Sequence, residues 1–338
     1  MSGASLQETA RALVADGKGI LAADESSGTI KKRLDSINVE STEANRRDYR
    51  ALLFSTPGAG QHISGVILFD ETLRQNAADG TPLVEIIQDA GMIPGIKVDK
   101  GAKPLAGHPD ETVTEGLDGL RERLEEYAGL GARFTKWRAV YRIGETIPGP
   151  ACITTNAHAL ARFAALSQEA GLVPVVEPEV LMDGDHDIDD CAEVTEEALR
   201  TVFAELAVQE VLLEGMLLKP NMVLSGKDCP EQAGVEEVAA RTLRCLRRTV
   251  PAAVPGMVFL SGGQSDEAAT LHLNAMNKLA GRASAEPAPW KLSFSYGRAL
   301  QAAPLKAWAG DHDKLAAAQA ALMERAKANG AATLGQYA

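Results

Sequence analysis

The residues most suited to chemistry are charged side chains that interrupt apolar runs. Lys219 ends the run GMLLKPN (residues 215–221), and Pro220 follows it directly. Burying an unpaired ammonium group is costly, so a lysine here either reaches water or has a chemical role. Two pairs of charged residues are spaced so that each pair shares one face of a β-strand. They are Lys136 with Arg138 in FTKWRAV and Glu177 with Glu179 in VPVVEPEV.

Amines and carboxylates in this pattern suit nucleophilic attack on a carbonyl group. An amine attacks only when it is unprotonated, whereas a free lysine has a pKa near 10.4. A second cation disfavours the charged form, because like charges about 5 Å apart repel by roughly 3 kcal/mol at an effective dielectric near 20. We therefore expect Lys136 to stay charged, held by Glu177 or Asp24, while Lys219 attacks a carbonyl to form a Schiff base.

Other catalytic patterns are weak or missing. The acidic stretch DGDHDIDDC (residues 183–191) contains possible metal ligands, but the remaining histidines are scattered and no HExxH pattern occurs. We interpret the stretch as a solvated loop and expect no metal or cofactor. A GxSxG motif, which marks the serine nucleophile of many hydrolases, is also missing from the sequence.

Bulk composition narrows the class of protein. The chain has 338 residues and a formal net charge of −12, and this acidity disfavours binding to nucleic acid or to anionic membranes. Four widely spaced cysteines without a CxxC motif suit reduced thiols. The N-terminal residues lack the basic and apolar regions of a secretory signal. We expect a cytoplasmic protein that acts on small molecules.

Short apolar or β-branched runs recur along the whole chain. They are GILAAD (19–24), GVILFD (65–70), GIKVDK (95–100), FTKWRAV (134–140), VPVVEPEV (173–180), GMLLKPN (215–221), GMVFLSGG (256–263) and KLSFSYG (291–297). Segments of helical periodicity separate most of them, and this alternation is typical of parallel strands. Eight such units predict a (β/α)8 barrel of the TIM type, because the first strand lacks the GxGxxG that many open dinucleotide-binding sheets carry.

The predicted organisation is one α/β domain over residues 1–338. The barrel strands occupy about residues 19–297, C-terminal helices about 298–330 and a short tail 331–338. We expect extra helices at the two ends of the chain, in residues 4–16 and 311–329. Residues that end parallel strands meet at the carboxyl-terminal mouth of such a barrel, where substrates bind.

The predicted strand ends are rich in charged and phosphate-binding residues. They carry Asp24, Asp70, Lys100, Lys136 with Arg138, Glu177 with Glu179, Lys219, Ser261 with Gly262, and Gly297 with Arg298. SGGQ after the seventh strand and YGR after the eighth occupy the place where many barrels bind phosphate through backbone N–H groups. Arg298 is suited to a bidentate phosphate contact. Pro220 indicates that the sixth strand ends near Lys219, because proline cannot donate to a ladder.

The motifs as a set resemble class I fructose-bisphosphate aldolase, from about residue 5 to 330. The matching blocks, in the family's order, are GILAADESSGTIKKRL, IKVDKG, PLAGHPDETVTEGLDGL, FTKWR, VPVVEPEVLMDGDHD, LLEGMLLKPNMV, FLSGGQSDEAA and LSFSYGRALQAAPLKAW. The resemblance implies reversible, metal-independent cleavage of fructose 1,6-bisphosphate to dihydroxyacetone phosphate and glyceraldehyde 3-phosphate, as part of glycolysis and gluconeogenesis.

The resemblance also implies roles for single residues. Lys219 is the implied Schiff-base lysine, Glu177 the general acid and base for carbinolamine formation and dehydration, and Asp24 the acceptor of the C4 hydroxyl proton. Lys136 is similar to the family's second lysine and Glu179 to its supporting carboxylate. The implied contacts to the C1 phosphate are Ser261, Gly262, Gly297 and Arg298. The implied contacts to the rest of the sugar are Ser26, Thr29, Arg33, Lys100 and Arg138.

One feature departs from the family pattern. Familiar members end in a mobile tail whose terminal tyrosine assists proton exchange at C3, whereas Tyr337 aligns with a tyrosine before that tail. We expect a slower or differently served C3 protonation. The resemblance further suggests a homotetramer.

Two alternatives stay open at this point. One is another imine-forming barrel enzyme, of the transaldolase type, that acts on a different phosphosugar. The other is a phosphosugar-binding scaffold that has lost turnover.

Overall fold

The computed structural model describes residues 3–281 and 284–338. Eight parallel strands close into a barrel in the order β1-β10-β9-β8-β7-β6-β3-β2. These strands are β1 (Gly19–Ala23), β2 (Ile63–Leu68), β3 (Ile93–Lys97), β6 (Phe134–Tyr141), β7 (Val173–Val180), β8 (Leu217–Leu218), β9 (Gly256–Phe259) and β10 (Lys291–Tyr296). Two short strands, β4 (Ala102–Pro104) and β5 (Thr112–Thr114), form a separate antiparallel pair. The predicted (β/α)8 barrel is confirmed.

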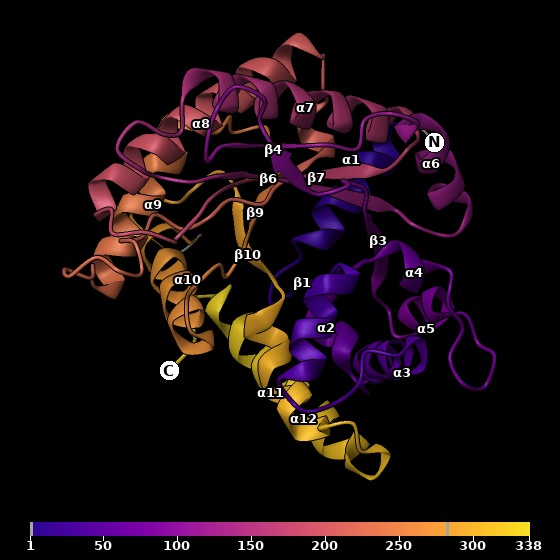
Figure 1. Cartoon of the computed structure of the whole chain (residues 1–338). Coiled ribbons are helices and arrows are strands. Elements are labelled where there is room, and N and C mark those ends of the chain that lie inside the picture. Colours follow the sequence, from indigo (N-terminus) through magenta and orange to yellow (C-terminus); the bar gives the residue numbers. More distant parts are fainter. Residues whose placement is uncertain (1–2, 282–283) are drawn as a thin grey trace.

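Helices surround this barrel. They are α1 (Gly3–Leu13), α2 (Ser27–Asp35), α3 (Glu43–Phe54), α4 (Asp70–Leu73), α5 (Leu83–Asp89), α6 (Leu120–Gly129), α7 (Pro150–Glu169), α8 (Ile188–Val208), α9 (Val235–Thr249), α10 (Asp266–Ala280), α11 (Arg298–Trp308) and α12 (Leu315–Ala332), with single 3-10 turns at Ala59–Gln61, Leu213–Gly215 and His312–Lys314. Figure 1 shows α7 and α8 at the top of the view, and α11 and α12 at the bottom.

Local sequence explains where several helices begin and end. Asp187 forms a capping box at the start of α8, and Ser265 caps α10 by accepting a hydrogen bond from the Ala268 N–H at 3.1 Å. Proline at the first position of α7 costs no hydrogen bond there, because that N–H has no helical partner. Gly171 has a φ of +74°, which glycine adopts without strain. It lies just past the end of α7 and turns the chain toward β7.

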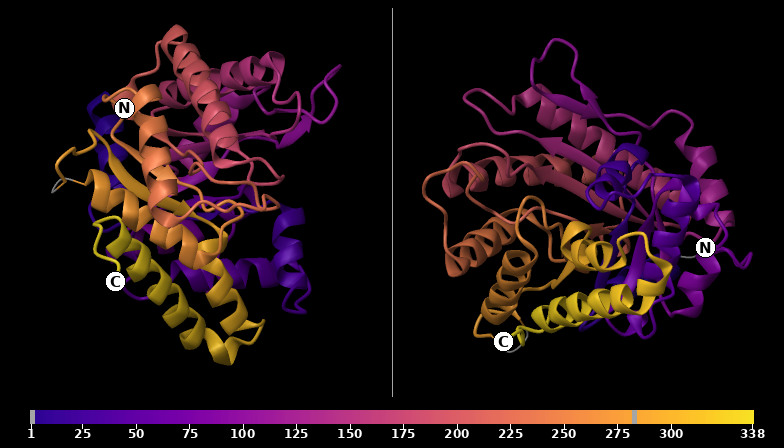
Figure 2. Two further views of the ribbon diagram at one scale, coloured as in Figure 1. Left: turned by 90° about the vertical axis from the view of Figure 1, so that its left-hand side faces the viewer. Right: turned by 60° about the horizontal axis from the view of Figure 1, so that its bottom comes forward.

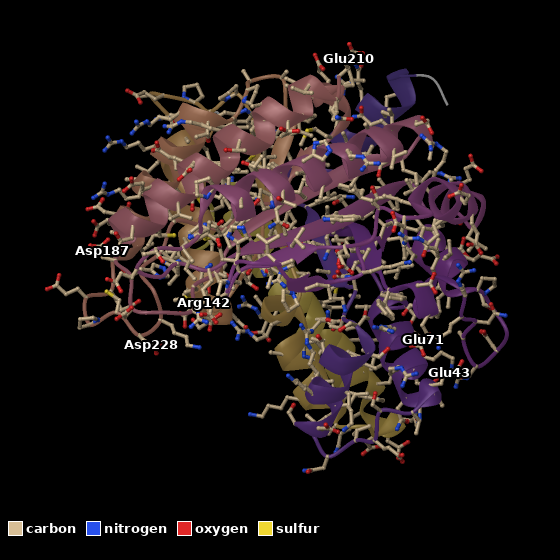
Figure 3. The ribbon with its side chains drawn as sticks, turned by 45° about the horizontal axis from the view of Figure 1, so that its top comes forward. Glu43, Glu71, Arg142, Asp187, Glu210 and Asp228 are labelled. Carbon is tan, nitrogen blue, oxygen red and sulfur yellow. The ribbon has the colours of Figure 1, made fainter. Side chains whose placement is uncertain are left out.

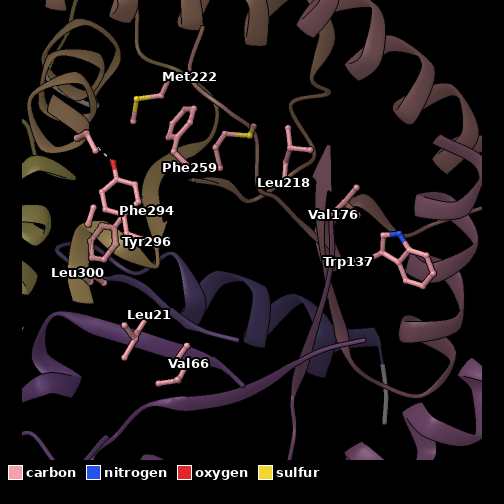
Figure 4. Close-up of a cluster of buried hydrophobic side chains, with 14 of the residues drawn as sticks. Leu21, Val66, Trp137, Val176, Leu218, Met222, Phe259, Phe294, Tyr296 and Leu300 are labelled. Atoms are coloured by element: carbon pink, nitrogen blue, oxygen red, sulfur yellow. Dashed lines mark hydrogen bonds between the residues drawn. The ribbon is translucent and has the colours of Figure 1, made fainter. Parts of the chain in front are cut away.

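Apolar side chains fill the barrel on both sides of its strands. Inside, Ile20, Phe134 and Val258 pack with Leu13 and Val14, which lie at the end of α1 and just beyond it. Outside, a larger cluster packs the strands against the helices. Figure 4 shows this outer layer, with labelled side chains from β1, β2, β6, β7, β8, β9 and β10. Burial on both faces explains why the strands read as continuous apolar runs rather than as alternating ones.

Extra helices lie at both ends of the chain, as expected. At the N-terminal end this helix is α1, and at the C-terminal end it is α12, which runs beside α11 in the views of Figure 2. Among the described residues, no helix combines the length and apolar character that crossing a bilayer requires.

Two predicted strands are displaced in the structure. The second runs over Ile63–Leu68 rather than 65–70, and the third over Ile93–Lys97 rather than 95–100. In the third case Pro94 hides the true start, since proline argues against a strand interior. Pro94 nevertheless pairs with Val66 in the register. The strand therefore ends at Lys97, and Lys100 lies beyond it on an exposed stretch.

The sixth strand is unusually short. Only Leu217 and Leu218 form β8, which ends directly before Lys219 and Pro220, as Pro220 indicates. The Lys219 N–H still donates to the Val176 carbonyl of β7 at 2.8 Å, and the Leu260 N–H donates to the Pro220 carbonyl at 3.2 Å. The backbone on both sides of the lysine is thus tied to neighbouring strands.

Candidate active site

A cavity of about 1110 Å³ opens at the carboxyl ends of the barrel strands. Every predicted site residue lines it: Asp24, Ser26, Thr29, Arg33, Lys100, Lys136, Arg138, Glu177, Glu179, Lys219, Ser261, Gly262, Gly297 and Arg298. A second cavity of about 850 Å³ lies near the starts of β9 and β10, at the other end of the barrel, and contains none of these residues. The first cavity is therefore the candidate active site.

Two buried lysines share one carboxylate at the bottom of this cavity. Lys219 Nζ lies 3.0 Å from Glu177 Oε1, and Lys136 Nζ lies 3.2 Å from Glu177 Oε2. Lys136 Nζ also lies 2.6 Å from Asp24 Oδ2. The side chains of both lysines and of Glu177 are at most 5% exposed. The expected ion pairs of Lys136 are present with both Asp24 and Glu177.

Strand order explains this arrangement. Lys136 lies on β6 and Glu177 on β7, while Lys219 directly follows β8, so the carboxylate comes from the strand between the two lysines. Arg138 pairs with Glu177 in the register of β6 and β7, which places Lys136 one pleat earlier on the same face. Asp24 follows β1 from the other side of the barrel.

Neighbouring charges decide the ionisation of three of these groups. Burial alone would raise the pKa of Asp24, but Lys136 and Lys219 hold that pKa well below its usual range. Burial likewise would raise the pKa of Glu177, and Lys136, Lys219 and Arg138 lower it. For Lys136 the burial effect is a lower pKa, which Asp24, Glu177 and Asp99 reverse into a strong increase. At neutral pH both carboxylates are therefore ionised and Lys136 is protonated.

Arg138 and Glu179 form a second ion pair near the mouth, between the Arg138 Nε and Glu179 Oε2 atoms. Burial would lower the pKa of Arg138, but Glu179 raises it above its usual range. Glu179 thereby holds Arg138 in place, as a supporting carboxylate would.

Lys97 and Asp99 were not among the predicted residues, yet both line the cavity. Lys97 ends β3 and lies opposite Lys136 in the strand register. Its Nζ donates to the Asp99 carbonyl oxygen at 2.9 Å and forms an ion pair with the Asp99 carboxylate. Lys97 is partly buried, whereas Lys100 is exposed. The geometry gives Lys97 the strand-end position that the sequence interpretation had assigned to Lys100.

The loop after β9 and the turn into α11 form one wall of the cavity. Gly262 has a φ of +54°, which favours glycine, and Ser261 is buried. Arg298 donates through Nη2 to the Gly262 carbonyl at 3.0 Å and to the Gln264 carbonyl. Gly297 directly precedes α11, so the N-terminus of that helix faces the same region. Arg298 thus ties the loop to α11, and its phosphate contact stays a prediction.

Next to this wall, Ser26 and Thr29 stand at the start of α2, with their hydroxyl oxygens 3.2 Å apart. Arg33 on the same helix forms an ion pair with Glu25, a buried carboxylate that also accepts from Gln301 Nε2 at 2.7 Å. The sequence interpretation missed Glu25. The position of Glu25, directly after Asp24 at the end of the first strand, could have indicated it.

The acidic loop at residues 183–190 has structural contacts. The carbonyls of Gly184 and His186 in this loop, and of Met182 directly before it, accept from the N–H groups of residues 226–228. Figure 3 shows Asp187, Asp228 and Arg142 on the same edge of the molecule. Within residues 3–281 and 284–338, no group of three or more His, Cys, Asp and Glu side chains is placed to hold a metal ion.

A (β/α)8 barrel with buried amines and carboxylates at the carboxyl ends of its strands has the architecture of an enzyme. Comparison with known proteins defines which one. The family model described as class I fructose-bisphosphate aldolase, a glycolytic family, matches residues 5–338. The chain therefore belongs to the class I fructose-bisphosphate aldolase family, whose members are lyases. The resemblance inferred from the sequence is confirmed.

Individual relatives agree with this assignment. The probable fructose-bisphosphate aldolase class 1 of Xanthomonas campestris pv. campestris is 61% identical over 338 residues, covering 100% of this chain and 99% of that protein. The cytosolic fructose-bisphosphate aldolase 4 of Arabidopsis thaliana is 57% identical over 321 residues, covering 95% and 80%. A crystal structure of fructose-bisphosphate aldolase from Plasmodium falciparum, in complex with TRAP and a small-molecule inhibitor, superposes with a TM-score of 0.96 at 51% identity, covering 99% and 95%.

The depressed pKa of Asp24 predicts an acid-sensitive contribution to stability. Because the folded-state pKa lies below the ordinary value of 3.8, the contribution is complete above about pH 4 and is lost progressively as the pH falls from there toward the lower folded-state pKa. Asp24→Asn should cost about 3 kcal/mol at pH 7 by removing a partner of buried Lys136. Urea unfolding between pH 7 and pH 3 should show the free energies of unfolding of the wild type and Asp24→Asn converging below about pH 4. A difference that stays constant over this range would contradict the assignment.

Tyr337 lies away from the candidate site. Its backbone N–H donates to Asn274 Oδ1, and its carbonyl accepts from Asn274 Nδ2, each at 3.0 Å. We expect deletion of Tyr337 and Ala338 to remove these two bonds at a cost of about 1 kcal/mol each, with at least roughly half of the activity retained. Steady-state rates and unfolding midpoints check this. A large fall in kcat at an unchanged midpoint would show that Tyr337 serves the reaction.

Proposed function

We propose that this chain reversibly cleaves fructose 1,6-bisphosphate through a Schiff base on Lys219. The observation that carries the proposal is the single carboxylate shared by two buried lysines, with Glu177 Oε1 3.0 Å from the Lys219 amine. Lys136, protonated and bound to Asp24, supplies a second positive charge close to the same carboxylate. This arrangement suits an amine nucleophile served by a nearby acid–base group.

The reaction begins with attack of the neutral Lys219 Nζ on the C2 carbonyl carbon. A C–N bond forms, and the carbonyl oxygen takes up a proton to give a carbinolamine. Loss of that hydroxyl as water yields a protonated imine. Glu177 lies where it can exchange the protons of both steps, because its Oε1 is 3.0 Å from the amine.

Cleavage of the C3–C4 bond follows. Ionised Asp24 accepts the proton of the C4 hydroxyl, and its depressed pKa keeps it ionised at neutral pH. The electron pair of the C3–C4 bond moves toward the imine nitrogen, which leaves an enamine on Lys219 and releases glyceraldehyde 3-phosphate. Protonation at C3 and hydrolysis of the imine then release dihydroxyacetone phosphate and restore the amine.

Different parts of the cavity lining suit the two phosphates. We assign the C1 phosphate to the loop of Ser261 and Gly262 and the N-terminus of α11, where Gly297 and Arg298 lie, because free N–H groups and a helix terminus favour anions. We assign the remainder of the substrate to the rest of the cavity lining, and we add Lys97 to its predicted contacts. These contacts are Ser26, Thr29, Arg33, Lys97, Lys100 and Arg138.

Borohydride reduction tests the central step. Incubation with fructose 1,6-bisphosphate and sodium borohydride should add a substrate-derived mass to Lys219, in the presence or absence of EDTA. Lys219→Met should give no adduct and lose at least roughly 10⁴-fold in kcat, because the covalent route is removed. Lys227→Met is the matched control, since Lys227 is an exposed lysine paired with Asp183. Peptide mapping by mass spectrometry locates the adduct.

Two outcomes would contradict the proposal. Activity abolished by EDTA, or turnover without any adduct on Lys219, would mean that another mechanism operates. Turnover that requires an added aldehyde acceptor would favour the transaldolase type of reaction instead.

We further propose a cytoplasmic homotetramer that binds neither nucleic acid nor membranes. The name of the Arabidopsis relative, which calls it cytosolic, supports the location. The net charge of −12 disfavours binding to nucleic acid and to anionic membranes. Light scattering on the purified protein should give about four times the chain mass of 35.7 kDa. The mass of a monomer would contradict the tetramer.

A further inference from the structure

The loop Ser261–Gln264 is held from behind by a buried side-chain relay. Gln264 is 4% exposed and does not line the cavity, whereas Ser261, Gly262 and Gly263 do. Gln264 Nε2 donates to the Ser261 carbonyl at 3.1 Å, and the Gln264 backbone N–H donates to the same carbonyl at 3.2 Å. Gln264 Oε1 lies 2.6 Å from Nδ1 of His272, a residue of α10 that is 7% exposed.

The hydrogen-bonding partners fix the direction of this relay. The Ser261 carbonyl only accepts, so the Gln264 amide must turn its NH₂ group toward it. The amide oxygen then faces His272, whose Nδ1 must carry the hydrogen. Burial lowers the pKa of His272 to about 4, so the imidazole is neutral at physiological pH and adds no charge behind the loop. One donor on α10 thus orients the whole Gln264 side chain.

This orientation bears on the cavity through peptide geometry. In a trans peptide the carbonyl of one residue and the N–H of the next point in opposite directions. Because the Ser261 carbonyl points back toward Gln264, the Gly262 N–H points away from Gln264, on the side of the cavity. Neither the Gly262 nor the Gly263 N–H donates to another group in the part of the chain that the structure describes. Both are free to bind an anion.

We propose that His272 is a positioning residue for anion binding, which acts through Gln264 to keep the Gly262 N–H directed at the substrate phosphate. The identity of that anion rests on the proposed function. The relay itself does not, because inorganic phosphate should use the same N–H groups.

Substitutions at both ends of the relay test it. His272→Leu removes the donor and should raise KM for fructose 1,6-bisphosphate and Kd for inorganic phosphate roughly ten-fold, with kcat at saturation changed less than about three-fold. His272→Asn carries an amide N–H near the position of Nδ1 and should keep both constants within about two-fold of the wild type. Gln264→Met, which retains side-chain length without the amide, should repeat the effect of His272→Leu.

Thr270→Val is the matched control on the same helix. Thr270 is buried, and its hydroxyl group contacts Asp266, Asn329 and Arg325, none of which belongs to residues 261–264. This variant should lower the unfolding midpoint while leaving KM and the phosphate Kd unchanged. Calorimetric titration with inorganic phosphate and steady-state kinetics provide both readouts.

The outcomes separate the inference from the proposed function. If His272→Leu and Gln264→Met leave KM and the phosphate Kd unchanged, or if Thr270→Val raises them equally, the positioning role is wrong. If His272→Leu does not fold, Gln264→Met alone decides. A wild type that gives no borohydride adduct overturns the proposed function, and the phosphate titration then still decides whether His272 positions the loop.

Discussion

The site depends on one carboxylate that serves two lysines. Glu177 contacts Lys219 through one oxygen and Lys136 through the other, and Asp24 holds Lys136 from the far side. Four ionisable groups are thereby buried beside partners, whereas a low-dielectric interior heavily penalises a charge that is buried without one. Removing Glu177 would leave Lys219 without its carboxylate partner, and removing Lys136 would leave Asp24 without its lysine. The same arrangement keeps an acid–base group within reach of the amine, so electrostatic necessity and chemical use coincide.

The barrel makes this pairing possible because it brings distant segments to one ring. Lys136, Glu177 and Lys219 come from consecutive positions in strand order, and closure of the barrel returns Asp24 to the same centre from the first strand. The apolar layers on either side of each strand hold this frame. In a close-packed core, strand positions leave little room for the charged ends to drift.

Much of this arrangement could be predicted from the sequence, and the failures have physical causes. Lys219 and Glu177 interrupt apolar runs, so both the strands and the charged residues at their ends can be predicted from the sequence. In GIKVDK two lysines stand three residues apart, and Pro94 conceals the start of the strand, so the sequence favoured Lys100 over Lys97. Glu25 and His272 were not predicted because their roles depend on partners such as Gln301 and Gln264, which only the folded chain brings to them.

The short strand β8 has a consequence for size selection. The Pro220 carbonyl accepts from the Leu260 N–H, so the residue after the lysine is bonded to the residue before Ser261. The main chain therefore sets the separation of the Lys219 backbone from the loop, and the ion pair with Glu177 holds the amine at 3.0 Å from Oε1. A fixed spacing selects substrates by length, because a ketone that reacts with the amine must also place its phosphate at the loop. For a sugar phosphate, the spacing limits the number of carbons between the reacting carbonyl and the phosphate.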